Sequence, residues 1–296
     1  MRWRGREQSE NVRDNRGAKG KKMAAGGGAG MLIVVVIALL FGKDKAQQFA
    51  QIQQRMGQNN AQPQEGAGAG IDDDSAEFIR VVLRDTETVW AEQFRSKTNV
   101  EYRKPVLNMF SNQTLSGCGQ QSSAMGPFYC PADEQIYIDP TFFNQLELRH
   151  NSEGDFARAF VIAHEVAHHI QNVLGWNRPL GAARSKGDKR LINQESVRLE
   201  LQADYLAGVW AHHIEKHARV LESGDLQEAM NAAFQIGDDT LQRQATGKVV
   251  PASFTHGSGK QRQRWFREGV HTGDFTKAVR ITGSSLGGPR IAYRDL

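Results

Sequence analysis

A five-residue run near the middle of the chain, HEVAH at residues 164–168, limits the possible folds more than any other feature. It lies inside an apolar stretch, residues 157–174, whose spacing predicts a buried helix that stops at Gly175. Residues four apart project from the same face of a helix, so the side chains of His164 and His168 point in one direction. Ionisable groups inside such a helix need partners, because burying them alone is costly.

This pattern, H-E-x-x-H, is typical of a helix that binds a zinc ion through its two histidines. His164 and His168 are therefore predicted to be metal ligands, and Glu165 is predicted to be the catalytic general base. Zinc lowers the pKa of a bound water to about 7, and a carboxylate beside the ion takes the proton. A helix with two unrelated histidines is the alternative, and the apolar setting argues against it.

A catalytic zinc ion needs a third protein ligand, and a second predicted helix, residues 191–217, supplies candidates. Glu200 and Asp204 are four residues apart, so they also share one helix face. Glu200 is predicted to complete the ligand set, and Asp204 to accept a hydrogen bond from the outer nitrogen of a ligand histidine. Glu195 is the alternative third ligand, although it faces elsewhere on the helix.

Three further histidines are less suited to the same site. His169 follows His168 directly and so points about 100° away around the helix, where it is expected to pack or to face solvent. His212 and His213 lie about three turns beyond Glu200, which is too far along the helix for them to share its metal ion.

The N-terminal quarter of the chain differs in composition from the rest. Residues 1–23 are polar and basic, residues 24–42 are uncharged and include MLIVVVIALLF, and residues 43–70 are rich in Gln, Gly and Ala. We expect a basic arm, one transmembrane helix and a flexible linker, followed by a catalytic domain over residues 71–296. The positive charge before the apolar segment places the arm in the cytoplasm and the domain outside the cytoplasmic membrane. A cleaved signal peptide is the alternative, but no small-residue cleavage site follows Phe41.

The two cysteines, Cys118 and Cys130, lie close together in the sequence among glycine and proline residues. In the oxidising compartment that this topology implies, we expect them to form a disulfide. In the cytosol, two buried free thiols would be the better interpretation.

The remaining pattern predicts a helix-rich α+β domain with a small β-sheet. The stretch FYCPADEQIYI, residues 128–138, is typical of two short strands joined by a turn. Further helices are expected over residues 72–97, 226–236 and 260–269.

Taken together, these segments resemble the bacterial neutral zinc metallopeptidase family of YpfJ-like membrane proteins. The matching stretches cover nearly the whole chain outside the linker: MRWRGR at residues 1–6, SGCG at 116–119, GPFYCPADEQIYID at 126–139, FVIAHEVAHHIQNVLG at 160–175, ELQADYLAGVWAHH at 200–213 and SFTHGSGKQRQRWF at 253–266. Two positions depart from the family pattern. HGSGKQR stands at residues 256–262 where HGT followed by Ser-x-Gln-Arg is expected, and Met125 stands in place of Thr.

The resemblance implies a zincin-like fold of the gluzincin type, with one Zn²⁺ ion held by His164, His168 and Glu200. It also implies a peptide or protein substrate, with Glu165 as the catalytic residue.

Zincin-like folds hold their substrate along an edge strand, by backbone hydrogen bonds. The strand just before the HEVAH helix, which includes Gln135, Ile136 and Tyr137, is the predicted one. His256 is the predicted second donor to the oxyanion of the transition state, with capping of the last helix as its alternative role. Tyr137 and Tyr205 are weaker options for the same donor.

The predicted function is thus peptide-bond hydrolysis by a membrane-anchored zinc metallopeptidase. A catalytically inactive zinc protein that binds a partner is the alternative, but it would not need Glu165. A hydrolase of non-peptide substrates is less favoured, because nothing resembles a nucleotide or sugar site. Nucleic-acid binding is not expected either, because the basic arm lacks interleaved aromatic residues and any recognised motif.

Overall fold

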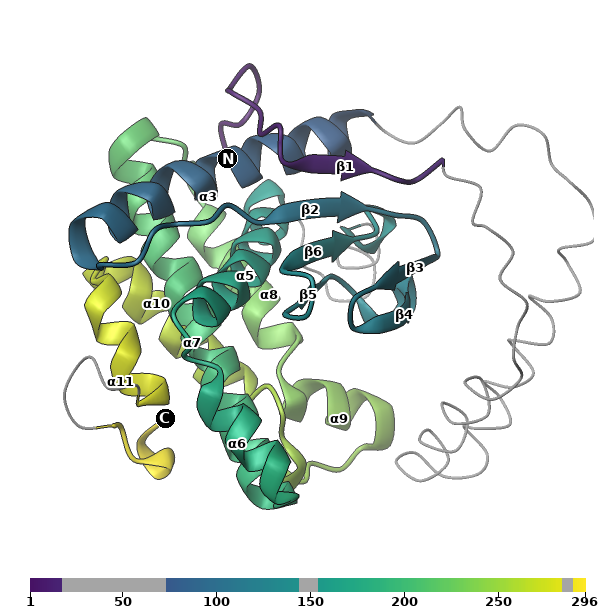
Figure 1. The fold of residues 1–296 in the computed structure, drawn as a ribbon, viewed down its shortest axis with the longest axis vertical. Coiled ribbons are helices and arrows are strands. Elements are labelled where there is room, and N and C mark those ends of the chain that lie inside the picture. The colour runs from purple at the N-terminus through teal and green to yellow at the C-terminus, as the bar shows by residue number, and fades with distance from the viewer. Residues whose placement is uncertain (18–72, 144–153, 284–289) are drawn as a thin grey trace, which may run out of the picture.

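The structure of the chain is a computed structural model, and it describes residues 1–17, 73–143, 154–283 and 290–296. It has a helix-rich α+β fold with small sheets, as the sequence predicts, and the helices gather on one side of the main sheet (Figure 1). Two long helices form the centre, α5 (Asp155–Val173) and α7 (Lys189–Ala218). Helix α5 is apolar almost all round, and the core therefore encloses it.

Three further helices pack around this pair: α3 (Asp73–Lys97), α8 (Asp225–Gln235) and α10 (Gly259–Thr272). All three are predicted from the spacing of their apolar residues, with bounds that differ by a few residues. Helix α5 ends where the sequence indicates, because Gly175 follows it with a φ of +68°, a left-handed conformation that favours glycine.

Helix α10 lies unusually close to α7 because small residues stand at their contact. A Cβ atom added to Gly208 would lie 2.2 Å from the carbonyl oxygen of Phe266, and one added to Gly269 would lie 2.1 Å from that of Tyr205. Only glycine fits at either position. This close approach sets the first turns of α10 against the acidic residues of α7.

The shorter helices were not predicted, because they have too few residues to show a clear apolar period. They are α6 (Arg178–Lys186), α9 (Asp238–Thr246) and α11 (Val279–Thr282), together with the 3₁₀ turns Ser123–Met125, Pro251–Ser253, Phe275–Ala278 and Tyr293–Asp295.

The main sheet has four strands among the described residues, in the order β1 (Val12–Asp14), β2 (Val106–Met109), β6 (Gln135–Ile138) and β5 (Phe128–Cys130). The first three run parallel to one another, whereas β5 runs antiparallel to β6.

This order corrects the prediction of the substrate edge strand. Gln135, Ile136 and Tyr137 belong to β6, which pairs with β2 on one side and with β5 on the other. On this side of the described sheet, the outer strand is therefore β5. An alternating apolar pattern identifies a strand but not its neighbours, and the pairing with β2 joins residues about 30 positions apart.

A two-stranded hairpin, β3 (Gln113–Ser116) and β4 (Gly119–Ser122), lies beside the main sheet. The predicted disulfide between Cys118 and Cys130 is present, and it joins the turn of this hairpin to β5. The hairpin is thereby held next to the outer strand.

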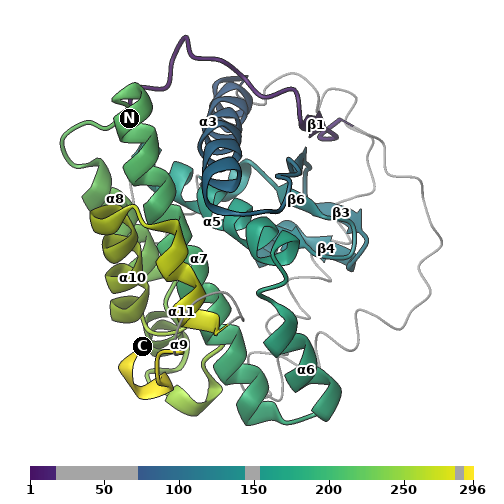
Figure 2. The ribbon, with the colours of Figure 1, turned by 60° about the vertical axis from the view of Figure 1, so that its left-hand side comes forward.

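The first 17 residues pack against the domain, although the sequence predicts residues 1–23 as a separate arm. Figures 1 and 2 show this segment running past α3 to the sheet, where β1 pairs with β2. The indole ring of Trp3 is buried, and its Nε1–H donates a hydrogen bond to Asp155 at 2.8 Å.

The predicted membrane anchor and linker, residues 24–42 and 43–70, lie outside the described residues. Within the described part of the chain, no helix is both long enough and apolar enough to cross a membrane.

Candidate metal centre

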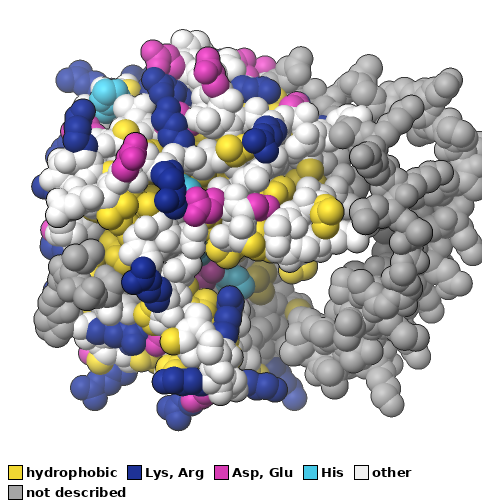
Figure 3. All heavy atoms as spheres, in the orientation of Figure 1, with side chains coloured by type: hydrophobic (Ala, Val, Ile, Leu, Met, Phe, Trp, Pro, Cys, Tyr) yellow, Lys and Arg dark blue, Asp and Glu magenta, His cyan; other side chains and the backbone are white. Residues whose placement is uncertain are grey.

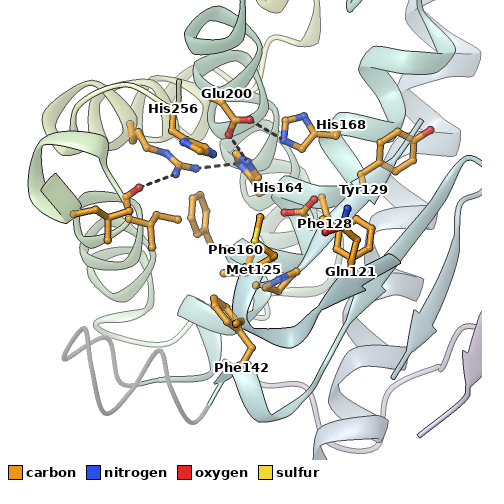
Figure 4. A pocket seen from close by; sticks show the side chains of 18 of the residues that line it. Gln121, Met125, Phe128, Tyr129, Phe142, Phe160, His164, His168, Glu200 and His256 are labelled. Atoms are coloured by element: carbon orange, nitrogen blue, oxygen red, sulfur yellow. Dashed lines mark hydrogen bonds and ion pairs between the residues drawn. The ribbon is translucent and has the colours of Figure 1, made fainter. Parts of the chain in front are cut away.

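Helices α5 and α7 bring the three predicted ligands together. Nε2 of His164 lies 3.2 Å from Oε2 of Glu200, and Nε2 of His168 lies 3.6 Å from Oε1 of the same carboxylate (Figure 4). Zinc bonds of about 2.0–2.1 Å in a tetrahedron put neighbouring ligand atoms about 3.3 Å apart. The donor set and its spacing therefore fit a zinc ion, and no other group of three such ligands is found among the described residues.

The outer nitrogen of His164 meets a buried ion pair. Its Nδ1–H donates to Oδ1 of Asp204 at 2.9 Å, which is the predicted role of Asp204. Arg262, on α10, donates to both oxygens of the same carboxylate, at 2.8 and 2.9 Å. Asp204 is fully buried and Arg262 nearly so, and the close contact of α7 with α10 places them side by side.

The charges of this cluster shift the pKa values of its members. Burial would raise the pKa of Asp204, but the Arg262 guanidinium and His164 lower it below its ordinary value. Burial alone would lower the pKa of His164, yet the Asp204 and Glu200 carboxylates raise it to about 9 in the metal-free site. Asp204 is thus held as an anion that can accept the hydrogen bond orienting the His164 ring.

The outer nitrogen of His168 has a partner that sequence reasoning missed, Gln171. Nδ1–H of His168 donates to Oε1 of Gln171 at 2.8 Å, which leaves Nε2 directed at the ligand cluster. The Gln171 amide is fixed in turn, because its Nε2 donates to Oε1 of Gln202 and to the carbonyl of Leu199 on α7. Its position three residues after His168, on the same helix face, was the available signal.

Glu165 lies beside the ligand cluster without belonging to it. It is buried, with 7% of its surface exposed, and it lines the cavity into which the ligands face. This is the arrangement that the sequence predicts for a general base.

His256 approaches the cluster from the loop before α10. Its ring lines the same cavity, and Nδ1 lies 3.3 Å from Oδ1 of Asp238. The negative charge of Glu200 is the main cause of a raised pKa at His256, and Asp238 adds to it. Ser258, not His256, caps α10, since its side chain accepts from the N–H of Gln261.

Asp238 holds the loop that carries His256, a role that the sequence does not predict. Its Oδ2 accepts hydrogen bonds from the backbone N–H groups of Thr255, His256 and Gly257, at 2.7, 2.6 and 3.0 Å. These bonds and the His256 ring lower the pKa of Asp238, although its burial opposes the shift. The loop is held so that His256 faces the cavity.

The ligand cluster forms part of the wall of an open cavity of about 610 Å³. Phe128 and Tyr129 of β5 line it, as do Met125, Phe142 and Phe160 (Figure 4). In the space-filling view, histidine and acidic side chains are visible in a hollow bordered by hydrophobic ones (Figure 3). A volume of this size is typical of a ligand-binding cleft.

The other candidate ligands have partners away from the proposed zinc site. Glu195 forms an ion pair with Arg290. The rings of His169, His212 and His213 each donate to a backbone carbonyl away from the ligand cluster. None of the four lines the cavity.

The two tyrosines considered as oxyanion donors also lie outside the cavity. The hydroxyl of Tyr137 donates to Asp133 at 2.7 Å, and that of Tyr205 donates to the carbonyl of Asp274 at 2.8 Å. Both side chains are buried in packing roles.

Comparison with known proteins identifies the class. The family described as "Putative neutral zinc metallopeptidase" matches residues 1–279, which is most of the chain. The chain belongs to this family, and the resemblance seen in its motifs is confirmed.

Relatives occur in several bacteria. The chain is 42% identical over 285 residues to "Uncharacterized protein YpfJ" of Escherichia coli strain K12, covering 93% of this chain and 96% of that protein. It is 41% identical over 196 residues to "Uncharacterized protein Rv2575" of Mycobacterium tuberculosis strain H37Rv, covering 63% of this chain and 65% of that protein. No solved structure shows a significant match.

Proposed function

We propose that this protein is a zinc metallopeptidase in which His164, His168 and Glu200 hold one Zn²⁺ ion. The observation that carries the proposal is the triangle of donor atoms at zinc-ligand spacing, beside Glu165, in the wall of an open cavity. The family of the chain supports it. When bound, zinc supplies a Lewis acid that activates water near pH 7 and polarises the substrate carbonyl.

Glu165 is the general base of the proposed reaction. It accepts a proton from the attacking water and delivers that proton to the amine that leaves. It adjoins His164 on α5 and faces the cavity, so it can reach both positions without binding the metal. A zinc protein that only binds a partner would have no use for a carboxylate here.

His256 is the proposed second donor to the oxyanion of the transition state. Nδ1–H donates to Asp238, so the protonated ring can also donate from Nε2 toward the cavity, and the Asp238 carboxylate favours that protonated ring by raising the pKa of His256.

Strand β5 is the proposed binding site for the peptide backbone. Within the described sheet it pairs only with β6, and Phe128 and Tyr129 place it along the cavity. An extended peptide can add to such an edge through main-chain hydrogen bonds, which bring a peptide carbonyl beside the zinc ligands.

The test is peptide hydrolysis by the full-length, zinc-loaded protein and its Glu165→Gln variant, on a diverse peptide mixture analysed by mass spectrometry. We expect the variant to retain zinc and to lose about 10²–10⁴-fold in rate, as for the loss of a general base. Equal rates for the two proteins, or no cleavage by either at full zinc occupancy, would refute the proposal.

A further inference from the structure

The cavity beside the ligand cluster has two unlike walls. One is formed by the side chains of the proposed zinc site, and the other carries Met125, Phe142 and Phe160; Val161 and Leu241 also line the cavity. Figure 4 shows Met125, Phe142 and Phe160 on one side of the ligand cluster. Among the described residues, every charged side chain that lines the cavity belongs to the zinc site or to its supporting ion pair. As far as the structure describes it, the second wall therefore offers no partner to a charged group.

Two apolar residues that line the cavity are unusual for their exposure. Met125 is 72% exposed and Leu241 is 39% exposed, and both line the cavity. Large apolar side chains are stabilised by leaving water, and contiguous exposed apolar surface marks binding sites. Because both side chains line the cavity, a substrate bound there would cover them.

Building on the proposed function, we infer that the enzyme cleaves extended polypeptides at bonds flanked by a large apolar side chain, such as Leu, Phe or Met. The peptide backbone pairs with β5, and the apolar side chain lies against the wall formed by Met125, Phe142 and Phe160. A charged side chain is disfavoured at that place, because burying it without a partner is costly.

The experiment maps cleavage sites in the same peptide mixture and measures kcat/KM for peptides that differ only at the flanking position. We expect kcat/KM to be at least about tenfold higher for peptides with Leu, Phe or Met at one flanking position than for peptides with Asp, Glu, Lys or Arg there. In the Met125→Asp variant this preference shrinks, and peptides with Lys or Arg gain relative to the parent enzyme.

Leu115→Asp is the matched control, because Leu115 is 69% exposed but does not line the cavity. This variant should keep the parent preference. Cleavage that favours charged flanking residues, or a Met125→Asp variant with an unchanged preference, would overturn the inference while the proposed function stands. Absence of any cleavage would instead remove the proposed function itself, and the inference with it.

A second inference comes from the N-terminal segment. Ser9 and Asn11 donate hydrogen bonds to the buried carboxylate of Glu87 on α3, at 2.6 and 2.7 Å. β1 pairs with β2 in parallel register, and Trp3 packs edge-on against Phe78 at 5.4 Å between ring centroids. These contacts make residues 1–17 part of the folded domain.

The basic residues of this segment also have partners on the domain. Arg4 pairs with Asp74 and Arg6 with Asp85, both on α3. These charges count toward the positive-inside prediction, yet the fold uses them to bind the segment to α3.

From this packing we infer that residues 1–17 and the catalytic domain lie on the same side of the bacterial membrane. A single crossing between them would place them on opposite sides and break the β1–β2 pairing. The expected single-pass topology, in which the N-terminus is cytoplasmic and the domain is outside, is the alternative that the test distinguishes.

The test uses an impermeant maleimide on intact cells that express full-length Gln8→Cys or Lys260→Cys protein. Both positions are exposed, one in the N-terminal segment and one on the domain, and the described cysteines are both in the disulfide. We expect both variants to be labelled or both to be protected, with both labelled after permeabilisation. Labelling of only one in intact cells would overturn the inference.

Discussion

Replacing Arg262 by methionine tests the role of the ion pair behind the zinc site. Methionine keeps much of the side-chain volume but removes the guanidinium that donates to both oxygens of Asp204. Asp204 is fully buried, so its carboxylate loses its main partner and keeps only His164. Removing one member of a buried ion pair lowers the free energy of unfolding by about 3–5 kcal/mol.

The effect should also reach the metal. Asp204 orients the ring of His164, and loss of such outer partners typically weakens metal binding about 10–100-fold. Urea denaturation of the zinc-loaded protein measures the first quantity, and competition with a chelator measures the second.

Arg267→Met is the matched control, since Arg267 lies on the same helix and is exposed. Its free energy of unfolding should change by less than about 0.5 kcal/mol. The double variant Asp204→Asn with Arg262→Met should be less destabilised than the sum of the single variants, because the two residues interact. If Arg262→Met were no more destabilising than Arg267→Met, the argument for a coupled Arg262–Asp204 pair would be refuted.

Three further predictions follow from the described contacts. Gln171→Leu removes the acceptor for Nδ1–H of His168 and should weaken zinc binding about 10–100-fold in a chelator competition; unchanged affinity would speak against this role. Replacing Cys118 and Cys130 together by serine should lower the free energy of unfolding in urea by about 3 kcal/mol, because the disulfide joins residues 12 positions apart and so restricts the unfolded chain. A decrease below about 1 kcal/mol would contradict this prediction. The raised pKa of His164, about 9 in the metal-free site, means that zinc binding at pH 7 should release its proton, with the release fading as the pH rises above 9. Calorimetry in buffers of different ionisation enthalpy measures this, and binding without proton release would contradict it.

The centre of the site could be predicted from the sequence because it depends on helix geometry alone. His164 and His168 are four residues apart on one helix, as are Glu200 and Asp204 on another, so each pair faces one way. The additional assumption is that the two helices pack against each other, and their apolar sequences support it because both must be buried. Gln171 obeys the same rule and could have been found.

The remaining features depend on contacts between distant segments. Arg262 is 58 residues from Asp204 and reaches it only because facing glycines allow α7 and α10 to approach closely. Whether β5 or β6 is the outer strand depends on the pairing of β6 with β2, which no local pattern encodes. The N-terminal segment is rich in charge and looked solvated, yet its partners lie on α3, about 70–80 positions away.

Zinc content is the most direct test of the central claim, that His164, His168 and Glu200 form one zinc site with Glu165 as its base. The full-length protein should be used, because residues 1–17 are part of the folded domain. We expect about one zinc per chain in the parent protein and in Glu165→Gln, and a loss of zinc in Glu200→Gln. A parent protein without metal, or a Glu200→Gln variant that keeps its full zinc content, would contradict the account.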